Sequence, residues 1–216
     1  MEQQDILSMT LPELQAAVQE LGEPKFRAKQ IFNWLHQKRV TDFSEMTTLS
    51  LPFRERLASD FCINRLKIAK RLASSVDDTV KYLYELPDGN YVETVCMQYH
   101  HGTSLCISTQ VGCRMGCRFC ASAIAGFVRN LTPAEMLLQI YETERAQNCK
   151  ISSLVLMGIG EPLDNFDNVL RFLQLLSDPN GYGMSLRHVT ISTCGVVPKI
   201  LELAEQRLGL TLSVSL

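Results

Sequence analysis

The stretch "SLCISTQVGCRMGCRFCAS" (residues 104–122) joins a short β-rich run to a loop with three cysteines. The cysteines have the spacing C-x3-C-x2-C and are Cys113, Cys117 and Cys120. This spacing also occurs on one face of an amphipathic helix. Gly112 and Gly116 interrupt the run, however, and glycine costs about 1 kcal/mol relative to alanine inside a helix. We therefore predict a strand over 104–109, followed by a loop that folds three sulfur atoms around one centre.

The composition is that of an ordinary globular protein. The chain has 216 residues, of which 46% are hydrophobic and 20% charged, and its formal net charge is -2. No charge excess draws the whole molecule to nucleic acid. The start "MEQQDILSMT" has no signal-peptide features, and no apolar run reaches the length of a membrane span. We expect a cytoplasmic protein with no membrane contact, whose clustered cysteines are reduced and either bind metal or take part in chemistry.

Three thiols are an unusual ligand set for a metal. Structural zinc sites use four ligands, often from two separated pairs, and the sequence has no second C-x2-C pair. A histidine brought in by the fold remains an alternative fourth ligand. Iron–sulfur clusters are normally held by four cysteines, so three thiolates on a four-iron cluster leave one iron open. An open iron can bind a substrate or cofactor. The lack of a fourth thiol would therefore serve the function of the site.

The chain downstream of the cysteines alternates strands and helices. We predict helices over 131–147, 165–176 and 197–207, and strands over 151–157, 187–193 and 208–216. Thr132, Pro133 and Glu135 form a helix-start signature with a capping box. The apolar run 151–157 is typical of a strand buried on both faces. The pattern predicts an α/β fold with a parallel sheet and right-handed crossovers, either open or a partial (βα) barrel.

Candidate binding residues follow successive strands of this sheet. In parallel sheets, function collects at the carboxyl ends of the strands. The cysteine loop follows the first strand, "GIGEP" (158–162) the second and "STCG" (192–195) the third. Ser215 and Leu216 end the fourth strand. Each polar residue alone reads as an ordinary turn or strand-end residue, but together they favour one shared ligand.

The N-terminal region has a different character. Helices are expected over 10–22 and 23–40, and a hairpin over 79–98. Between residues 24 and 40 the second helix carries basic residues without an acid, namely Lys25, Arg27, Lys29, Lys38 and Arg39, and a further basic stretch follows at 61–72. Such charges form either a solvated face or a phosphate-binding surface. We expect a helical accessory RNA-binding domain over 1–65, a β-hairpin extension over 66–100 and the barrel over 101–216.

The cysteine motif resembles the signature of the radical S-adenosylmethionine superfamily. Further stretches resemble the RlmN/Cfr family within it, including "KFRAKQIFNWL", "DGNYVETV", "GFVRNLTPAE", "MGIGEPLDN" and "HVTISTCGVVP". The resemblance implies a [4Fe-4S] cluster on Cys113, Cys117 and Cys120, whose open iron is chelated by S-adenosylmethionine. It also implies cofactor contacts from strand ends and the cysteine loop, at Phe119, Gly160, Glu161, Ser192, Ser215 and Leu216.

Members of this family methylate carbon 2 of an adenosine in 23S rRNA, and the RlmN members also modify tRNA. The resemblance implies two molecules of S-adenosylmethionine, a methylcysteine intermediate and a reductant such as flavodoxin or ferredoxin. Cys106 matches the family's resolving cysteine and Glu93 its proton acceptor. Cfr-type relatives methylate carbon 8, but we expect carbon 2 and a monomeric protein.

The sequence also raises an expectation about completeness. The family's methyl-carrying cysteine lies beyond the fourth strand, whereas the sequence stops at Leu216. We therefore expect a fragment that lacks this cysteine and does not complete methyl transfer. Two alternatives stay open. One is a non-catalytic zinc- or Fe-S-bearing RNA-binding module, and the other a radical enzyme with another substrate.

Overall fold

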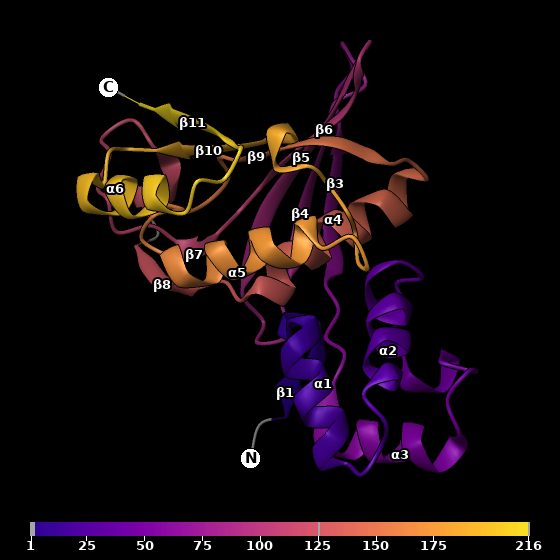
Figure 1. The fold of residues 1–216 in the computed structure, drawn as a ribbon. Coiled ribbons are helices and arrows are strands. Elements are labelled where there is room, and N and C mark those ends of the chain that lie inside the picture. Colours follow the sequence, from indigo (N-terminus) through magenta and orange to yellow (C-terminus); the bar gives the residue numbers. More distant parts are fainter. Residues whose placement is uncertain (1–2, 125, 216) are drawn as a thin grey trace.

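A twisted sheet of seven strands organises the molecule (Figure 1). The computed structural model describes residues 3–124 and 126–215. The strand order is β11-β10-β9-β6-β5-β4-β3. Four strands are parallel: β6 (Gly102–Ile107), β9 (Ile151–Leu156), β10 (Val189–Thr193) and β11 (Thr211–Val214). The other three are antiparallel: β3 (Lys67–Ala73), β4 (Val80–Glu85) and β5 (Tyr91–Tyr99).

Three helices alternate with the parallel strands, as expected. They are α4 (Pro133–Gln147), α5 (Phe166–Ser177) and α6 (Val197–Glu205), and Figure 1 shows them on the same side of the sheet. The predicted capping box starts α4, because the Thr132 hydroxyl accepts from the Glu135 N–H and the Glu135 carboxylate accepts from the Thr132 N–H. The α/β prediction with parallel strands is confirmed.

The sheet keeps its other face open. Along β9, Ile151, Leu154 and Leu156 are buried, whereas Ser153 and Val155 are only half-buried. The expectation that this strand is buried on both faces is therefore wrong. Helices α4, α5 and α6 cover one face only, so alternate side chains of each strand reach the uncovered side. We call this uncovered side the open face.

The hairpin joins the same sheet as the parallel strands. The β4–β5 turn contains Gly89, whose φ of 80° suits glycine, and it lies within the hairpin predicted over 79–98. Strand β5 then pairs antiparallel with β6, with Val95 opposite Cys106. The boundary expected at residue 100 therefore falls within a continuous sheet. Within the described residues, no helix has the length and apolarity to cross a membrane.

The N-terminal lobe consists of α1 (Leu11–Glu20), α2 (Phe26–His36) and α3 (Leu51–Asp60) (Figure 1). Two short parallel strands, β1 (Gln4–Asp5) and β2 (Phe61–Cys62), close it. The capping box of Thr10 and Glu13 starts α1, as predicted. The sequence analysis missed α3.

Charged contacts fasten this lobe to the sheet domain. Arg171 of α5 donates to both oxygens of Glu13, at 2.7 and 2.6 Å. Arg39 forms an ion pair with the buried Glu144 of α4 and lies over the ring of Tyr141. Its guanidinium therefore belongs to the contact between lobe and sheet domain. This corrects the assignment of Arg39 to the basic surface.

Candidate functional site

A small two-stranded ribbon, which the sequence did not reveal, frames the cysteine loop. Strand β7 (Gln110–Gly112) leads into the loop and pairs antiparallel with β8 (Phe127–Asn130), which leaves it. Gly112 has a φ of +73°, and a Cβ there would lie 1.7 Å from the Gly126 carbonyl oxygen. Only glycine fits this crossing. The Cys113 N–H donates to the same carbonyl at 3.0 Å, which closes the ribbon at the loop.

The three cysteines of the motif open into one pocket at the carboxyl ends of the parallel strands. They are half-buried thiols. Four segments line the pocket, through Cys113, Met115, Cys117, Phe119, Cys120, Ser122, Met157, Gly158, Gly160, Glu161, Ser192, Thr193, Cys194 and Ser215. The fold therefore gathers the loops that the sequence predicted to share one ligand.

Glu161 ties the second and third strand ends together. The carboxylate is 4% exposed, and its two oxygens accept from the backbone N–H groups of Leu163 at 3.0 Å and Cys194 at 2.9 Å. A carboxylate oxygen has more than one lone pair, so Glu161 retains accepting capacity toward the pocket. Gly160 comes before it with a φ of +105°, and a Cβ there would lie 2.6 Å from the Cβ of Gln110. The glycine lets the Glu161 loop pack directly on Gln110.

The remaining cofactor candidates lie around the same pocket. Ser192 is 8% exposed on β10, and the Ser215 N–H donates to the Thr193 carbonyl at 2.9 Å. Phe119 is 91% exposed on the loop surface, so its ring packs little against the protein. Leu216 lies outside the described residues.

Glu93 and Cys106 lie on the open face beside this pocket, and neither is among its lining residues. Val95 is paired with Cys106 across β5 and β6, so the side chains of Glu93 and Cys106 project from the same face. Ser108 donates to the Glu93 carbonyl at 2.6 Å. Glu93 therefore lies at the end of the sheet from which the chain enters the cysteine loop. The Glu93 carboxylate is 3.2 Å from the Lys81 ammonium. Burial raises the pKa of the Cys106 thiol.

Two regions of the chain match described protein families. Residues 4–63 match the ribosomal RNA large subunit methyltransferase N-terminal domain, and residues 107–216 match the Radical SAM superfamily. The second match takes in the cysteine loop, the Glu161 loop and the strands that follow. The chain belongs to the radical SAM superfamily.

Relatives within the radical SAM superfamily carry the RlmN name. The chain is 52% identical over 215 residues to the probable dual-specificity RNA methyltransferase RlmN of Lachnoclostridium phytofermentans, and 49% identical over 216 residues to that of Alkaliphilus oremlandii. These matches cover 98% and 100% of the chain, which spans 60% and 63% of those relatives. The crystal structure of a radical SAM methyltransferase from Sphaerobacter thermophilus matches with a TM-score of 0.91 and 35% identity, over 99% of this chain and 63% of that one. The expected resemblance to RlmN is confirmed.

Radical SAM membership implies a [4Fe-4S] cluster and S-adenosylmethionine. Within residues 3–124 and 126–215, no three His, Cys, Asp or Glu side chains converge as ligands of a single metal ion do. A cluster, in contrast, takes each thiolate on a different iron atom, so its ligands need a shared pocket rather than a single point. Burial raises the pKa of the Cys113 thiol, and Cys120, Glu161 and Cys117 raise it further through their charges. The three thiols and Glu161 line the same pocket, and the donor set fits the cluster.

The sequence analysis missed the polar residues that brace this site. Asn165 donates to the carbonyl groups of Thr109 and Leu131, which lie at the two ends of the cysteine loop. Gln110 donates to the Asp164 carboxylate. The available signal was local: "TQVG" before the cysteines and "PLDN" after Glu161 place polar residues between apolar ones. That pattern indicates buried polar side chains but not their partners.

Proposed function

We propose that the protein is an RNA adenine-C2 methyltransferase of the radical SAM type. One observation carries the proposal. A pocket lined by three cysteine thiols, Glu161 and Ser192 lies beside an open sheet face that presents Glu93 and Cys106. Carbon 2 of adenine is electron-poor and resists ordinary methyl transfer, so its methylation needs radical chemistry.

The residues around the pocket would hold both cofactors. Cys113, Cys117 and Cys120 would bind the cluster as thiolates, with release of their protons. The cluster and S-adenosylmethionine together supply a carbon-centred radical able to take a hydrogen atom from a methyl group. Glu161 offers a carboxylate to an ammonium group. The cofactor's other contacts would come from Ser192, Ser215 and Leu216, and from the backbone at Phe119 and Gly160.

The open face would receive the base. In this proposal a covalent crosslink between the protein and the RNA base forms during the reaction, and Cys106 helps to resolve it. The Cys106 thiol keeps its proton until that point, consistent with the raised pKa that burial gives it. Glu93 accepts the proton from the adenine. Both groups reach the open face, which no helix of residues 3–124 and 126–215 covers.

The RNA partners would be 23S rRNA and tRNA, bound through phosphate contacts. Lys25 and Lys29 of the N-terminal lobe are exposed, and so is every residue of the edge strand β3, which carries Lys67 and Lys70. Exposed lysines of this kind supply most of the affinity for nucleic-acid backbones. We further propose a monomeric cytoplasmic protein that receives electrons from a carrier such as flavodoxin or ferredoxin.

Two measurements test the proposal. The chain is purified without oxygen and reconstituted with iron and sulfide, and about four of each per chain are expected. Stoichiometric zinc without sulfide would favour the non-catalytic RNA-binding module instead. RNA from cells with and without the gene is then digested and analysed by mass spectrometry. Loss of 2-methyladenosine on deletion supports the proposal, whereas loss of 8-methyladenosine or no change in either nucleoside contradicts it.

A further inference from the structure

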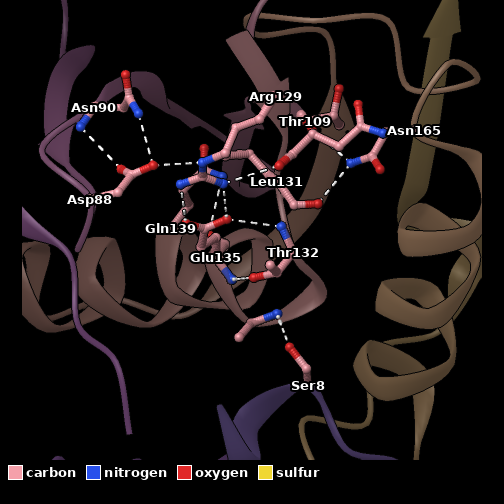
Figure 2. Close-up of polar contacts among 12 residues, drawn as sticks. Ser8, Asp88, Asn90, Thr109, Arg129, Leu131, Thr132, Glu135, Gln139 and Asn165 are labelled. Atoms are coloured by element: carbon pink, nitrogen blue, oxygen red, sulfur yellow. Dashed lines mark hydrogen bonds and ion pairs between the residues drawn. The ribbon is translucent and has the colours of Figure 1, made fainter. Parts of the chain in front are cut away.

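Asn165 holds both ends of the cysteine loop with a single amide. Its Nδ2 atom donates to the carbonyl oxygens of Thr109 and Leu131, each at 2.8 Å (Figure 2). Thr109 comes directly before β7 and Leu131 directly after β8, and the Leu131 N–H donates to the Thr109 carbonyl at 3.0 Å. The Asn165 side chain is 2% exposed, so losing its two donors leaves buried carbonyl groups weakly satisfied.

Gln110 connects the same loop ends to the Glu161 loop. The residue is fully buried, and its Nε2 donates to Asn130 Oδ1 at 2.8 Å and to Asp164 Oδ2 at 2.7 Å. Its Oε1 accepts from the Glu161 N–H at 2.9 Å. Every hydrogen-bonding atom of this amide therefore joins β7 to another segment of the site.

Asp164 extends these contacts into the loop. Its Oδ2 atom lies 2.9 Å from Nε of Arg114, which stands between Cys113 and Cys117. The Arg114 guanidinium also lies over the Phe127 ring of β8, 3.8 Å from its centroid. We define Gln110, Asp164 and Asn165 together as the neck clasp.

The neck clasp spans the two parts of the pocket that must act together. Strands β7 and β8 share few residue pairs, with an irregularity in their register between Val111 and Gly112, and fix the loop weakly by themselves. The Glu161 loop cannot shift without disturbing Gln110, because Gly160 packs against it. We infer that the neck clasp is a positioning device that sets the cysteine loop against the Glu161 loop. Gln110, Asp164 and Asn165 are positioning residues. The inference rests on the proposed function only in taking the cysteine loop to hold the cluster.

The clasp can be broken and restored by exchanging donor and acceptor. Gln110→Glu keeps the acceptor for the Glu161 N–H but turns a carboxylate oxygen toward Asp164. Adding Asp164→Asn supplies a donor at that point. We expect amide hydrogen exchange over 111–131 in the metal-free chain to accelerate about tenfold in the single variant. The double variant should exchange more slowly than the single variant but faster than the wild type, because it restores the contact at position 110 while the Arg114 Nε–H loses its Oδ2 acceptor.

A matched control separates positioning from general loss of stability. Thr143→Val removes a buried hydrogen bond from Tyr84 to α4, where no cysteine-loop residue takes part. Its exchange over 111–131 should stay near the wild-type rate. After reconstitution and chemical reduction of the cluster to its paramagnetic state, addition of S-adenosylmethionine should change the electron paramagnetic resonance spectrum of the wild type and of Thr143→Val. The change should be lost in Gln110→Glu and recovered in part in the double variant.

Equal loop exchange in Gln110→Glu and Thr143→Val overturns the inference, and so does a double variant that remains as fast as the single one. If Gln110→Glu does not fold, Asp164→Ala breaks the contacts with Gln110 and Arg114 at a side chain that is 22% exposed. The same tenfold acceleration is then expected, and a wild-type rate contradicts the inference. Failure of the wild type to take up iron and sulfide defeats the proposed function instead, because the exchange experiment needs no cluster.

Discussion

Nδ1 of His36 lies 2.9 Å from the hydroxyl oxygen of Tyr141, and this buried contact joins α2 of the N-terminal lobe to α4. The other ring nitrogen of His36 has no hydrogen-bond partner among the described residues. Burial lowers the pKa of His36 to about 4, against a smaller opposing effect of Asp178. The contact is therefore built for a neutral imidazole.

Protein stability should fall as the pH drops from about 6.5 to about 4 because of this histidine. In that window the unfolded chain binds a proton at His36 that the folded chain does not, so acid favours unfolding. The effect of His36 on stability is absent above pH 6.5 and reaches a loss of about 3 kcal/mol below pH 4. Urea unfolding at several pH values is compared between the wild type and His36→Gln. The difference in slope is the relevant quantity, because buried Asp5, with its pKa raised to about 6, acts in the opposite direction in both proteins. Identical slopes would contradict the assignment.

Arg129 connects three segments around the start of α4 (Figure 2). Its guanidinium donates to both oxygens of the buried Glu135, at 2.8 and 2.7 Å, and to Asp88 of the hairpin turn at 2.6 Å. Arg129→Ala should lower the free energy of unfolding by about 2–3 kcal/mol, since it leaves the Glu135 carboxylate buried without its cation. Asp88→Asn removes the partner that is 40% exposed and should cost under about 1 kcal/mol. The free energy of unfolding of both variants is measured by chemical denaturation. Equal losses would show that the buried pair of Arg129 and Glu135 stabilises the protein no more than the contact with Asp88.

Gly112→Ala should destroy the geometry of the loop neck, because its Cβ has no room beside the Gly126 carbonyl. We expect iron and sulfide uptake to fall at least about fivefold, with a stability loss of more than about 2 kcal/mol. Gly116→Ala is the control, since this residue also has a positive φ of 69° but no atom within 4 Å of the added Cβ. It should cost about 1 kcal/mol and retain the cluster. Metal and sulfide analysis after anaerobic reconstitution compares the two, and equal losses would count against a specific role of Gly112.

Replacing Lys25 and Lys29 together by alanine should weaken RNA binding and reduce the slope of log K against log salt by about 1.5–2. Arg27 is left unchanged because its guanidinium is already bonded to Gln30 and to the Thr48 carbonyl. Lys150→Ala is a control. This exposed lysine lies before β9, at the amino-terminal end of the parallel strands and so opposite the cysteine loop. Binding is measured by fluorescence anisotropy over a salt series. An unchanged slope would return both lysines to the role of a solvated surface.

The sequence predicted elements wherever one local pattern determines the structure. The capping box of Thr132 and Glu135, the helix predicted over 165–176 and the hairpin predicted over 79–98 each depend on residues close together in the sequence. Helix α3 was missed because only Phe53 and Leu57 of it are buried, a single pair one turn apart that resembles an irregular segment.

Other features depend on contacts that no local pattern contains. Strands β7 and β8 are too short for periodicity, and their pairing depends on a crossing at Gly112 and Gly126 from either side of the cysteines. The spacing of Cys113, Cys117 and Cys120 singled out this loop, and the structure places all three at one pocket. The partners of Gln110 were not accessible from the sequence, because Asp164 is distant in sequence and becomes its neighbour only when β9 pairs with β6.

The order of the strands has a consequence for how the chain folds. Strands β3, β4, β5 and β6 are consecutive neighbours joined by short turns, so their contacts are local and form at low entropic cost. Strands β9, β10 and β11 each attach beside the previous parallel strand only after an intervening helix has been made. We expect the meander of β3, β4, β5 and β6 to form first. The parallel strands then add to its β6 side in chain order, and the cysteine loop closes when β9 pairs with β6.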